Sequence, residues 1–370
     1  MVSFKTFKKS SKARYGQLQT KHGLIETPVF MPVGTAATVK AMTSEAVAET
    51  GAQIILANTY HLMLRPSESL IGELGGLHHF MNWQKPILTD SGGYQVMSLG
   101  GCNKISEEGV CFRSHIDGHY EMLSPERSIN IQHILGSTIT MAFDECTPYN
   151  VNHDQARLSM ERSMRWAKRS KDAFKARDGY GLFGICQGSV FSDLRQVSCE
   201  KLVDIGFDGY AIGGLAVGET QAEMFAMIEA VNLHLPQSQA RYLMGVGKPD
   251  DIVGAVARGV DMFDCVLPTR SGRNAQAFTD DGARNLRNSG YKRQDKPLDE
   301  NCSCICCTRY SRAYLHHLVK SGEMLGAMLL TQHNLTWYQG LMRRIRNHIK
   351  QQTFDDFARH FVYKRIHADA

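Results

Sequence analysis

The chain has 370 residues, of which 43% are hydrophobic and 21% are charged, and this composition indicates a globular protein with material for one large core or two modest ones. The formal net charge of +5 permits a nucleic-acid partner without requiring one. No apolar run approaches the roughly 18 residues of a membrane helix, and the N-terminal stretch MVSFKTFKKSSKARYGQ has no apolar signal segment, so we expect a cytoplasmic protein with no membrane partner.

Eight short apolar segments are predicted strands, at residues 28–33, 53–58, 86–90, 138–144, 182–187, 209–214, 242–246 and 262–266. From the fifth strand onward they alternate with segments whose apolar residues recur every three or four positions, at 192–206, 221–235 and 249–259. Strands that alternate with amphipathic helices form a parallel sheet covered on its faces. The predicted fold class is therefore α/β, a (β/α)8 TIM barrel over residues 1–275.

Polar residues or glycines recur at the C-terminal ends of these strands: Asn58, Asp90, Asp144, Gln187, Gly213, Gly214, Gly245 and Asp264. In a parallel barrel these ends converge on the face that carries active sites. Polar residues also end strands at ordinary turns, but three aspartates at three strand ends favour a shared pocket, because an unpaired carboxylate costs free energy when it is partly buried.

The glycine-rich stretches do not match a nucleotide-binding fingerprint. TDSGGYQ at 89–95 lacks the G-x-G-x-x-G spacing, and GVGKPDD at 245–251 lacks the pattern of a P-loop. The remaining chemistry is that of paired carboxylates without an evident metal, which suits attack at an anomeric carbon: one carboxylate is the nucleophile and the other handles the proton. The alternative for any single aspartate is a helix cap or an ion pair.

Residues 271–334 break the strand–helix rhythm and contain the cysteine cluster CSCICC. We expect a small zinc-binding subdomain over 276–334, inserted before a last barrel helix at 335–370. The four closely spaced thiols are Cys302, Cys304, Cys306 and Cys307, and the candidate histidines are His316, His317 and His333. Such thiols with a histidine are typical of a tetrahedral structural zinc site, and the alternative is a buried or oxidation-prone thiol cluster.

Long motifs in this chain resemble the bacterial tRNA-guanine transglycosylase family. They are MPVGT (31–35), LANTYHLMLRP (56–66), LTDSGGYQVMSL (88–99), MAFDECTPY (141–149), GFDGYAIGGLAVGE (206–219), YLMGVGKPDD (242–251), MFDCVLPTR (262–270), CSCICC and the later TQHNL. The resemblance covers essentially the whole chain. It implies a barrel with a zinc subdomain near its end, and an enzyme that exchanges guanine at the wobble position of tRNA for preQ1, a 7-deazaguanine precursor of queuosine.

The resemblance assigns catalytic roles to two aspartates. Asp264 is expected to be the nucleophile that attacks C1′ of the ribose and forms a covalent ribosyl-enzyme. Asp90 is expected to be the general acid/base, which helps guanine to leave and then accepts a proton from the incoming base. Two displacements at one carbon would retain the anomeric configuration, as in retaining glycosidases.

The resemblance also assigns a base pocket. Asp144 is expected to accept hydrogen bonds from the pyrimidine-ring N–H groups of the purine, and Gln187 and the Gly214 N–H to bind its carbonyl oxygen. The Leu215 carbonyl is expected to meet the aminomethyl group of preQ1, and Tyr94 and Met244 to sandwich the ring. Ser91 completes the expected substrate-binding residues.

The family pattern implies further partners and ligands. Arg270 and Arg273 match RNA-contacting arginines. The pattern C-x-C-x-x-C followed far downstream by His selects one structural Zn²⁺ per subunit, with ligands Cys302, Cys304, Cys307 and His333, and leaves Cys306 surplus. The expected partners are tRNAs of the Asp, Asn, His and Tyr type with GUN anticodons, preQ1 or guanine, and a second copy of the chain in a homodimer.

Four positions bear on how closely the family pattern holds. Ser67 and Ala275 stand where many relatives have glycine, near the presumed RNA face. Val217 and Cys146 are retained beside the pocket; relatives that use the bulkier base queuine look smaller at the first of these positions, so the small precursor preQ1 is favoured.

Two other functions use the same features. A carboxylate glycosidase would use Asp90 and Asp264 but would need aromatic sugar platforms, whereas the chain has three tryptophans and a basic insert with no purpose there. A catalytically silent RNA-binding relative would have lost its acids, whereas Asp90, Asp144 and Asp264 are all present.

Overall fold

The eight predicted strands are present and form one parallel barrel in the computed structural model, which describes residues 1–99 and 104–368. Most of the expected segments leave the sheet before their C-terminal end, so the strands are shorter than expected. In sheet order they are β4 (Val29–Met31), β15 (Met262–Asp264), β14 (Ala240–Leu243), β13 (Gly209–Ile212), β12 (Gly181–Cys186), β11 (Ile139–Met141), β7 (Ile87–Thr89), β6 (Ile55–Ala57) and β5 (Val33–Gly34).

The first predicted strand is split, and the split closes the barrel. β4 pairs with β15, and β5, which follows after Pro32, pairs with β6. Proline has no N–H to donate to a neighbouring strand, so the ladder breaks at this residue. The carbonyl of Pro32 still accepts a bond from Leu56 N at 2.9 Å, which keeps the segment in contact with the next strand.

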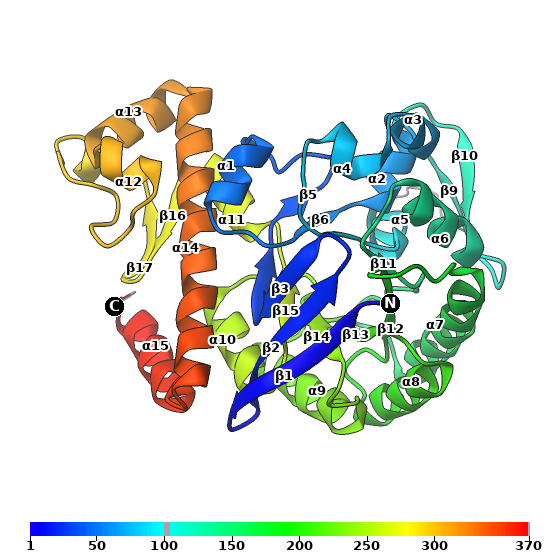
Figure 1. Cartoon of the computed structure of the whole chain (residues 1–370). Helices are drawn as coiled ribbons and strands as arrows, with labels where there is room; N and C mark the ends of the chain where they lie inside the picture. Colours follow the sequence, from blue (N-terminus) through cyan, green and yellow to red (C-terminus); the bar gives the residue numbers. More distant parts are fainter. Residues whose placement is uncertain (100–103, 369–370) are drawn as a thin grey trace.

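Helices surround the barrel, as Figure 1 shows. The predicted helices at 192–206, 221–235 and 249–259 are confirmed as α8, α9 and α10 with small differences at their ends. The helices in chain order are α1 (Ser44–Glu49), α2 (Thr59–Leu64), α3 (Glu68–Glu73), α4 (Gly76–Phe80), α5 (Gly93–Leu99), α6 (Pro125–Ile134), α7 (His153–Ala173), α8 (Ser192–Ile205), α9 (Gln221–His234), α10 (Pro249–Ala257), α11 (Leu267–Arg273), α14 (Met324–Lys350) and α15 (Phe354–Ala368).

The inside of the barrel is packed with apolar side chains. Along β12, Phe183 and Ile185 join the interior cluster, while Leu182 and Cys186 join the larger cluster between strands and helices. This alternation follows from the two-residue period of a strand. The barrel is therefore a filled core, and a substrate site has to lie at one of its ends.

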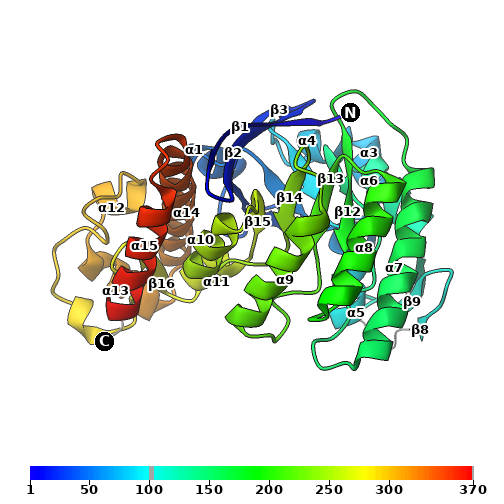
Figure 2. The same cartoon turned by 90° about the horizontal axis from the view of Figure 1, so that it is seen from below.

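Two small antiparallel sheets lie at opposite ends of the barrel (Figure 2), and the sequence analysis predicted neither. One consists of β1 (Ser3–Ser10), β2 (Ala13–Thr20) and β3 (Gly23–Thr27), and the other of β8 (Lys104–Ile105), β9 (Val110–Arg113) and β10 (Tyr120–Leu123). The first is fixed to the barrel by a buried ion pair between Arg14 on β2 and Asp261, the residue before β15.

The cysteine-rich region forms a compact unit beside the barrel (Figure 1). It contains β16 (Gln276–Thr279), β17 (Gly282–Asn285), the 3-10 turn η1 (Ser289–Tyr291), α12 (Ile305–Arg309) and α13 (Arg312–Ser321). It has its own apolar cluster, which includes Ala277, Leu286, Leu298, Leu315 and Leu330. Helix α14 begins at Met324, so the expected boundary between residues 334 and 335 falls inside a continuous helix that serves both units.

Within the described ranges, none of the helices combines the length and the apolar character that a membrane crossing requires.

Candidate active site and metal centre

The polar strand ends predicted to share a pocket lie at the C-terminal end of the barrel, on the side opposite the β1–β2–β3 sheet. The loops after β13, β14 and β15 line a cavity of about 540 Å³ there. Its walls include Ala216, Gly245, Lys248, Cys265 and Arg270. Cys265 directly follows Asp264, so the cavity opens beside the predicted nucleophile.

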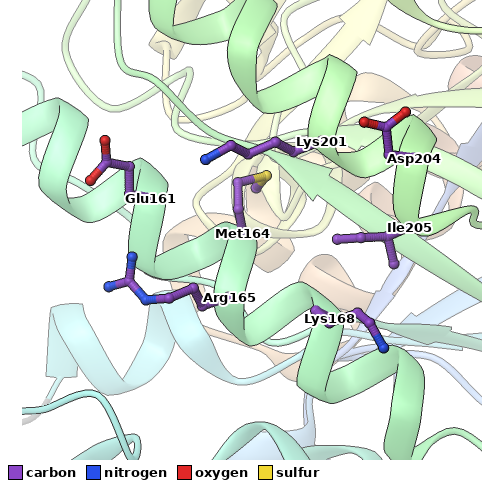
Figure 3. A pocket seen from close by; sticks show the side chains of 7 residues that line it. All are labelled: Glu161, Met164, Arg165, Lys168, Lys201, Asp204 and Ile205. Atoms are coloured by element: carbon purple, nitrogen blue, oxygen red, sulfur yellow. The ribbon is translucent and has the colours of Figure 1, made fainter.

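A second hollow has a different character. Figure 3 shows it between α7 and α8, and its lining residues are Glu161, Met164, Arg165, Lys168, Lys201, Asp204 and Ile205. All of them belong to these two outer helices, and none is one of the polar strand-end residues. It is a surface groove of the helix layer and plays no part in the strand-end site.

Asp264 is held by one of its two carboxylate oxygens. Oδ1 accepts a hydrogen bond from the Tyr242 hydroxyl at 2.6 Å and another from Gly245 N at 2.7 Å. Both donors come from β14 or the loop that follows it, which is the strand next to β15. The pKa of Asp264 is raised by burial, and the bonds from Tyr242 and Gly245 oppose that shift. The arrangement orients the carboxylate while its other oxygen, Oδ2, takes no part in these two bonds.

Asp90 follows β7 and is held by the loop after β6. Its Oδ2 accepts a hydrogen bond from the Asn58 side chain, and its Oδ1 accepts one from Thr59 N at 2.8 Å. The pKa of Asp90 is raised to about 7; burial is the largest cause, the bonds from Thr59 and Asn58 oppose it, and the negative charge of Asp264 adds to it. The two carboxylates therefore sense each other electrostatically, although β7 and β15 are separated in the sheet order on both sides.

Asp144 forms the centre of a polar cluster that the strand ends bring together. Its Oδ1 accepts a bond from the Ser91 hydroxyl at 3.0 Å, and its Oδ2 accepts one from Gln187 Nε2 at 2.7 Å. Burial raises the pKa of Asp144 to about 6, and these two bonds oppose the rise. Gln187 Oε1 is buried and has no hydrogen-bond partner among the described residues. A buried acceptor without a partner is costly, so it suits a ligand that brings an N–H group.

The loop after β13 is shaped by a buried cation. The Arg195 guanidinium donates to the carbonyls of Cys186 at 3.0 Å and Gly213 at 2.7 Å. Gly214 has φ +62, a left-handed conformation that glycine adopts without a steric penalty. A Cβ at this residue would lie 2.5 Å from Gln187 Oε1, so the backbone passes directly against the polar cluster. Further along, Glu219 accepts bonds from the backbone N–H groups of Ala216 and Val217.

The remaining predicted site residues differ in how far they are exposed. Tyr94 on α5 is 54% exposed, which leaves its ring available at the surface. Leu215 is buried, and Met244 is half-buried against the barrel interior. Arg270 and Arg273 lie on α11, three residues apart, and both are exposed. Three-residue spacing places them on the same side of the helix.

The four zinc ligands selected from the family pattern converge. One candidate ligand atom each from Cys302, Cys304, Cys307 and His333 lies within 4.8 Å of the others. The His333 Nε2 atom is 2.8 Å from the Phe278 carbonyl, so this nitrogen carries the proton and Nδ1 faces the thiols. Three thiolates and a histidine whose second nitrogen bonds a carbonyl match the donor set of a structural zinc site.

The surplus cysteine and the other histidines have separate places. Cys306 is fully buried in the apolar cluster of the cysteine-rich unit, where a thiol packs as a small hydrophobe. His316 and His317 lie on α13, and His316 Nδ1 is 2.7 Å from the Leu286 carbonyl.

Both departures from the family pattern occupy backbone that favours glycine. Ser67 has φ +123 and Ala275 has φ +71. A side chain in this region costs free energy that glycine avoids. These two residues therefore place a side chain on backbone that favours glycine, at positions outside the polar cluster around Asp144.

Sequence reasoning missed several residues that hold the predicted acids. Tyr242 and Arg195 were not singled out, and Asn58 was noted only as a strand end. Tyr242 is fully buried inside an apolar strand, and a hydroxyl there needs a polar partner. That requirement was the signal in the sequence that could have identified it.

Comparisons with known proteins agree on one family. A family model described as queuine tRNA-ribosyltransferase matches residues 9–367. A relative from Zymomonas mobilis, named queuine tRNA-ribosyltransferase, is 61% identical over 363 residues, which cover 97% of this chain and 94% of the relative. Relatives of the same name from Rickettsia bellii and Rickettsia akari are 62% and 61% identical and cover 94% and 96% of this chain, and 96% and 98% of their own lengths.

Proposed function

Because the chain belongs to the queuine tRNA-ribosyltransferase family, we propose that its strand-end pocket exchanges guanine at the wobble position of GUN-anticodon tRNAs for preQ1. The observation that supports this proposal is the electrostatic interaction of two carboxylates, the buried Asp90 and the half-buried Asp264, which lie at the C-terminal ends of strands that are not neighbours in the sheet. Their environments differ: Asp264 is held by a phenol and a backbone N–H, and Asp90 by an amide and a backbone N–H.

In the proposed first step, Asp264 Oδ2 attacks C1′ of the ribose. The bond from C1′ to the base nitrogen breaks, the electron pair leaves with guanine, and Asp90 supplies the proton that neutralises it. A ribosyl ester of Asp264 results. In the second step the incoming base attacks C1′, Asp90 accepts its proton, and the Asp264 carboxylate leaves. Two displacements at one carbon retain its configuration.

The base is proposed to bind in the polar cluster. Asp144 in its ionised form accepts from the purine N–H groups, and Ser91 orients Asp144. Gln187 Nε2, which donates one hydrogen to Asp144, donates its second hydrogen to the carbonyl oxygen of the base together with the Gly214 N–H. A site whose polar groups are buried rejects bases that leave them unpaired. Tyr94 and Met244 cover the two faces of the ring.

The proposed preference for the small base rests on Val217 and Cys146, which the family resemblance places beside the pocket. Cys146 and Val217 are both half-buried, and Val217 N is fixed by Glu219 Oε2 at 3.0 Å. The Leu215 carbonyl is proposed to bind the aminomethyl group. We propose that preQ1 is used in preference to queuine, and equal incorporation of the two bases would contradict this.

Isotope exchange tests the function directly. Radiolabelled guanine incubated with the protein and an unmodified GUN-anticodon tRNA is expected to enter the RNA, and unlabelled preQ1 is expected to chase it out. A tRNA with the wobble guanine replaced by adenine is the matched control and should take up no label. If the GUN tRNA also remains unlabelled, the proposed exchange is wrong; release of sugar from an oligosaccharide would favour a glycosidase instead.

The pH dependence should report the acid and the nucleophile separately. Asp90 must be protonated to assist departure of guanine, and this form is lost as the pH rises through its pKa of about 7. Asp264 must be ionised, and its raised pKa brings the acidic loss of activity closer to neutrality. We expect the single-turnover rate of ribosyl-enzyme formation to fall about tenfold per pH unit once the pH exceeds the pKa of Asp90. In Asp90→Asn this alkaline decline should disappear; an unchanged decline would assign it to another group.

The remaining assignments concern ligands and partners. Zn²⁺ at Cys302, Cys304, Cys307 and His333 would supply a tetrahedral cross-link that stabilises the cysteine-rich unit, and metal analysis should give one zinc per chain.

Arg270 and Arg273 are proposed to contact the RNA backbone, so tRNA affinity should fall as the salt concentration rises. A homodimer is proposed, and light scattering that gives the mass of one chain would exclude it.

A further inference from the structure

Helix α14 contacts the loops on both sides of Asp264, and it does so through residues that bind neither substrate nor metal. The helix carries His333 of the Cys/His cluster in its first half and packs on the barrel in its second half. Two buried polar side chains lie between these regions, Asn334 and Tyr338. Each donates to a backbone carbonyl in a segment that follows β14 or β15.

Tyr338 fixes the loop that holds the carboxylate. Its hydroxyl donates to the Gly247 carbonyl at 2.6 Å, in the loop after β14. Two residues earlier in the same loop, Gly245 N donates to Asp264 Oδ1 at 2.7 Å. A Cβ placed on Gly247 would lie 2.3 Å from the Cβ of Cys265, so the loop backbone also packs against the residue next to Asp264. A shift of this loop therefore moves Gly245 N, which donates a hydrogen bond to the Asp264 carboxylate.

Asn334 fixes the helix that carries the two arginines. Its side-chain amide donates to the Pro268 carbonyl at 3.0 Å, in the first turn of α11, and to the Gln276 carbonyl at 2.9 Å. The two helices also meet backbone to backbone, because a Cβ on Gly272 would lie 2.7 Å from Thr331 N. Arg270 and Arg273 lie on α11, so the bond from Asn334 to this helix also fixes the position of the backbone that carries the two arginine side chains.

The Cys/His cluster is connected to Asn334 through a single residue. Phe278 N donates to Asn334 Oδ1 at 2.9 Å, and the Phe278 carbonyl is 2.8 Å from His333 Nε2. Consecutive residues of α14 thus bond both polar groups of one residue on β16. Both Asn334 and His333 are completely buried, so these bonds are shielded from competition with water.

We propose that Asn334 and Tyr338 are positioning residues of the base-exchange reaction: Tyr338 sets the geometry of the Asp264 carboxylate, and Asn334 sets the position of the arginine helix α11. The inference rests on the proposed function. It assigns the two contacts different kinetic consequences, since a nucleophile displaced by a fraction of an ångström slows the chemical step, whereas displaced arginines weaken RNA binding.

The experiment compares three variants of the full-length, zinc-loaded protein in the guanine-exchange assay. Tyr338→Phe removes one hydroxyl, and Asn334→Asp keeps the acceptor for Phe278 N but replaces the donor that bonds Pro268 and Gln276. Thr336→Val is the matched control on the same helix, because the Thr336 hydroxyl donates to Gln332 O within α14. Zinc content and melting temperature are measured for each variant.

The expected results separate the two roles. Relative to the Thr336→Val control, Tyr338→Phe should lower kcat about tenfold with KM for tRNA within about twofold, and Asn334→Asp should raise KM for tRNA about tenfold. A kcat for Tyr338→Phe equal to that of the control overturns the proposal, as does a KM effect in place of a kcat effect. If Asn334→Asp loses zinc, Tyr338→Phe decides alone, because it leaves all four Cys/His side chains unaltered. Failure of the wild-type protein to exchange guanine would instead reject the proposed function.

Discussion

Asp264→Asn is expected to abolish guanine exchange, with a loss of about 10⁴-fold or more, because the substitution removes the negative charge that attacks the ribose. Asparagine keeps an oxygen that can accept the bonds from Tyr242 and Gly245, so the loop geometry should survive. The measurement is twofold: incorporation of labelled guanine into tRNA, and the amount of protein–RNA adduct that resists denaturation. Both signals should vanish in the variant.

The control is the same substitution at an aspartate on the protein surface. Asp172 lies on α7 with 60% of its side chain exposed, and it pairs with Lys168 one helical turn away. Asp172→Asn should leave exchange and adduct within about twofold of the wild type, because exposed ion pairs contribute little. If the Asp264→Asn protein still forms the adduct, the nucleophile is a different side chain, and Asp90 is the first residue to test.

Arg14→Met is expected to destabilise the protein by about 3–5 kcal/mol, which is the cost of leaving a buried charge without its partner. The side chains of Arg14 and Asp261 are 1% and 0% exposed. Arg14 also donates to the carbonyls of Gln237 at 2.9 Å and Gln239 at 3.1 Å, so its loss removes these two bonds as well as those to Asp261. The free energy of unfolding from urea titration is the measurement.

The control for this second prediction is an ion pair at the surface. Lys168→Met removes a charge whose side chain is 59% exposed, and the free energy of unfolding should change by less than about 1 kcal/mol. Similar losses in Arg14→Met and Lys168→Met would show that the buried pair does not anchor the first sheet to the barrel.

The sequence carried enough information for the eight barrel strands, because short apolar segments between amphipathic helices have few other solutions. It did not indicate that Pro32 divides the first strand, since a proline in an apolar segment is also compatible with a strand end. The β1–β2–β3 sheet was missed because its exposed strands, such as SFKTFKKS at 3–10, are mostly polar and lack a continuous apolar run.

For the site, the aspartates could be found because each follows an apolar strand. The residues that hold them were harder to find, because Tyr242 and Arg195 lie inside elements whose periodicity is dominated by packing. Long-range contacts such as Tyr338 to Gly247 connect residues 91 positions apart, and no local pattern encodes that pairing. The Cys/His cluster is the reverse case: its spacing pointed to a metal, and family resemblance chose His333 among three histidines.

The end of the barrel opposite the strand-end residues bears on the order of events in base exchange. The β1–β2–β3 sheet lies at that end (Figure 2), and side chains such as Phe183 and Met262 fill the interior, so a base has to reach the proposed site from the C-terminal end of the strands. In the proposed mechanism the RNA also approaches from that end, and its sugar is attached to Asp264 between the two steps. The outgoing guanine must therefore dissociate toward that end before the incoming base can bind there. Between these two events the tRNA stays attached to the protein.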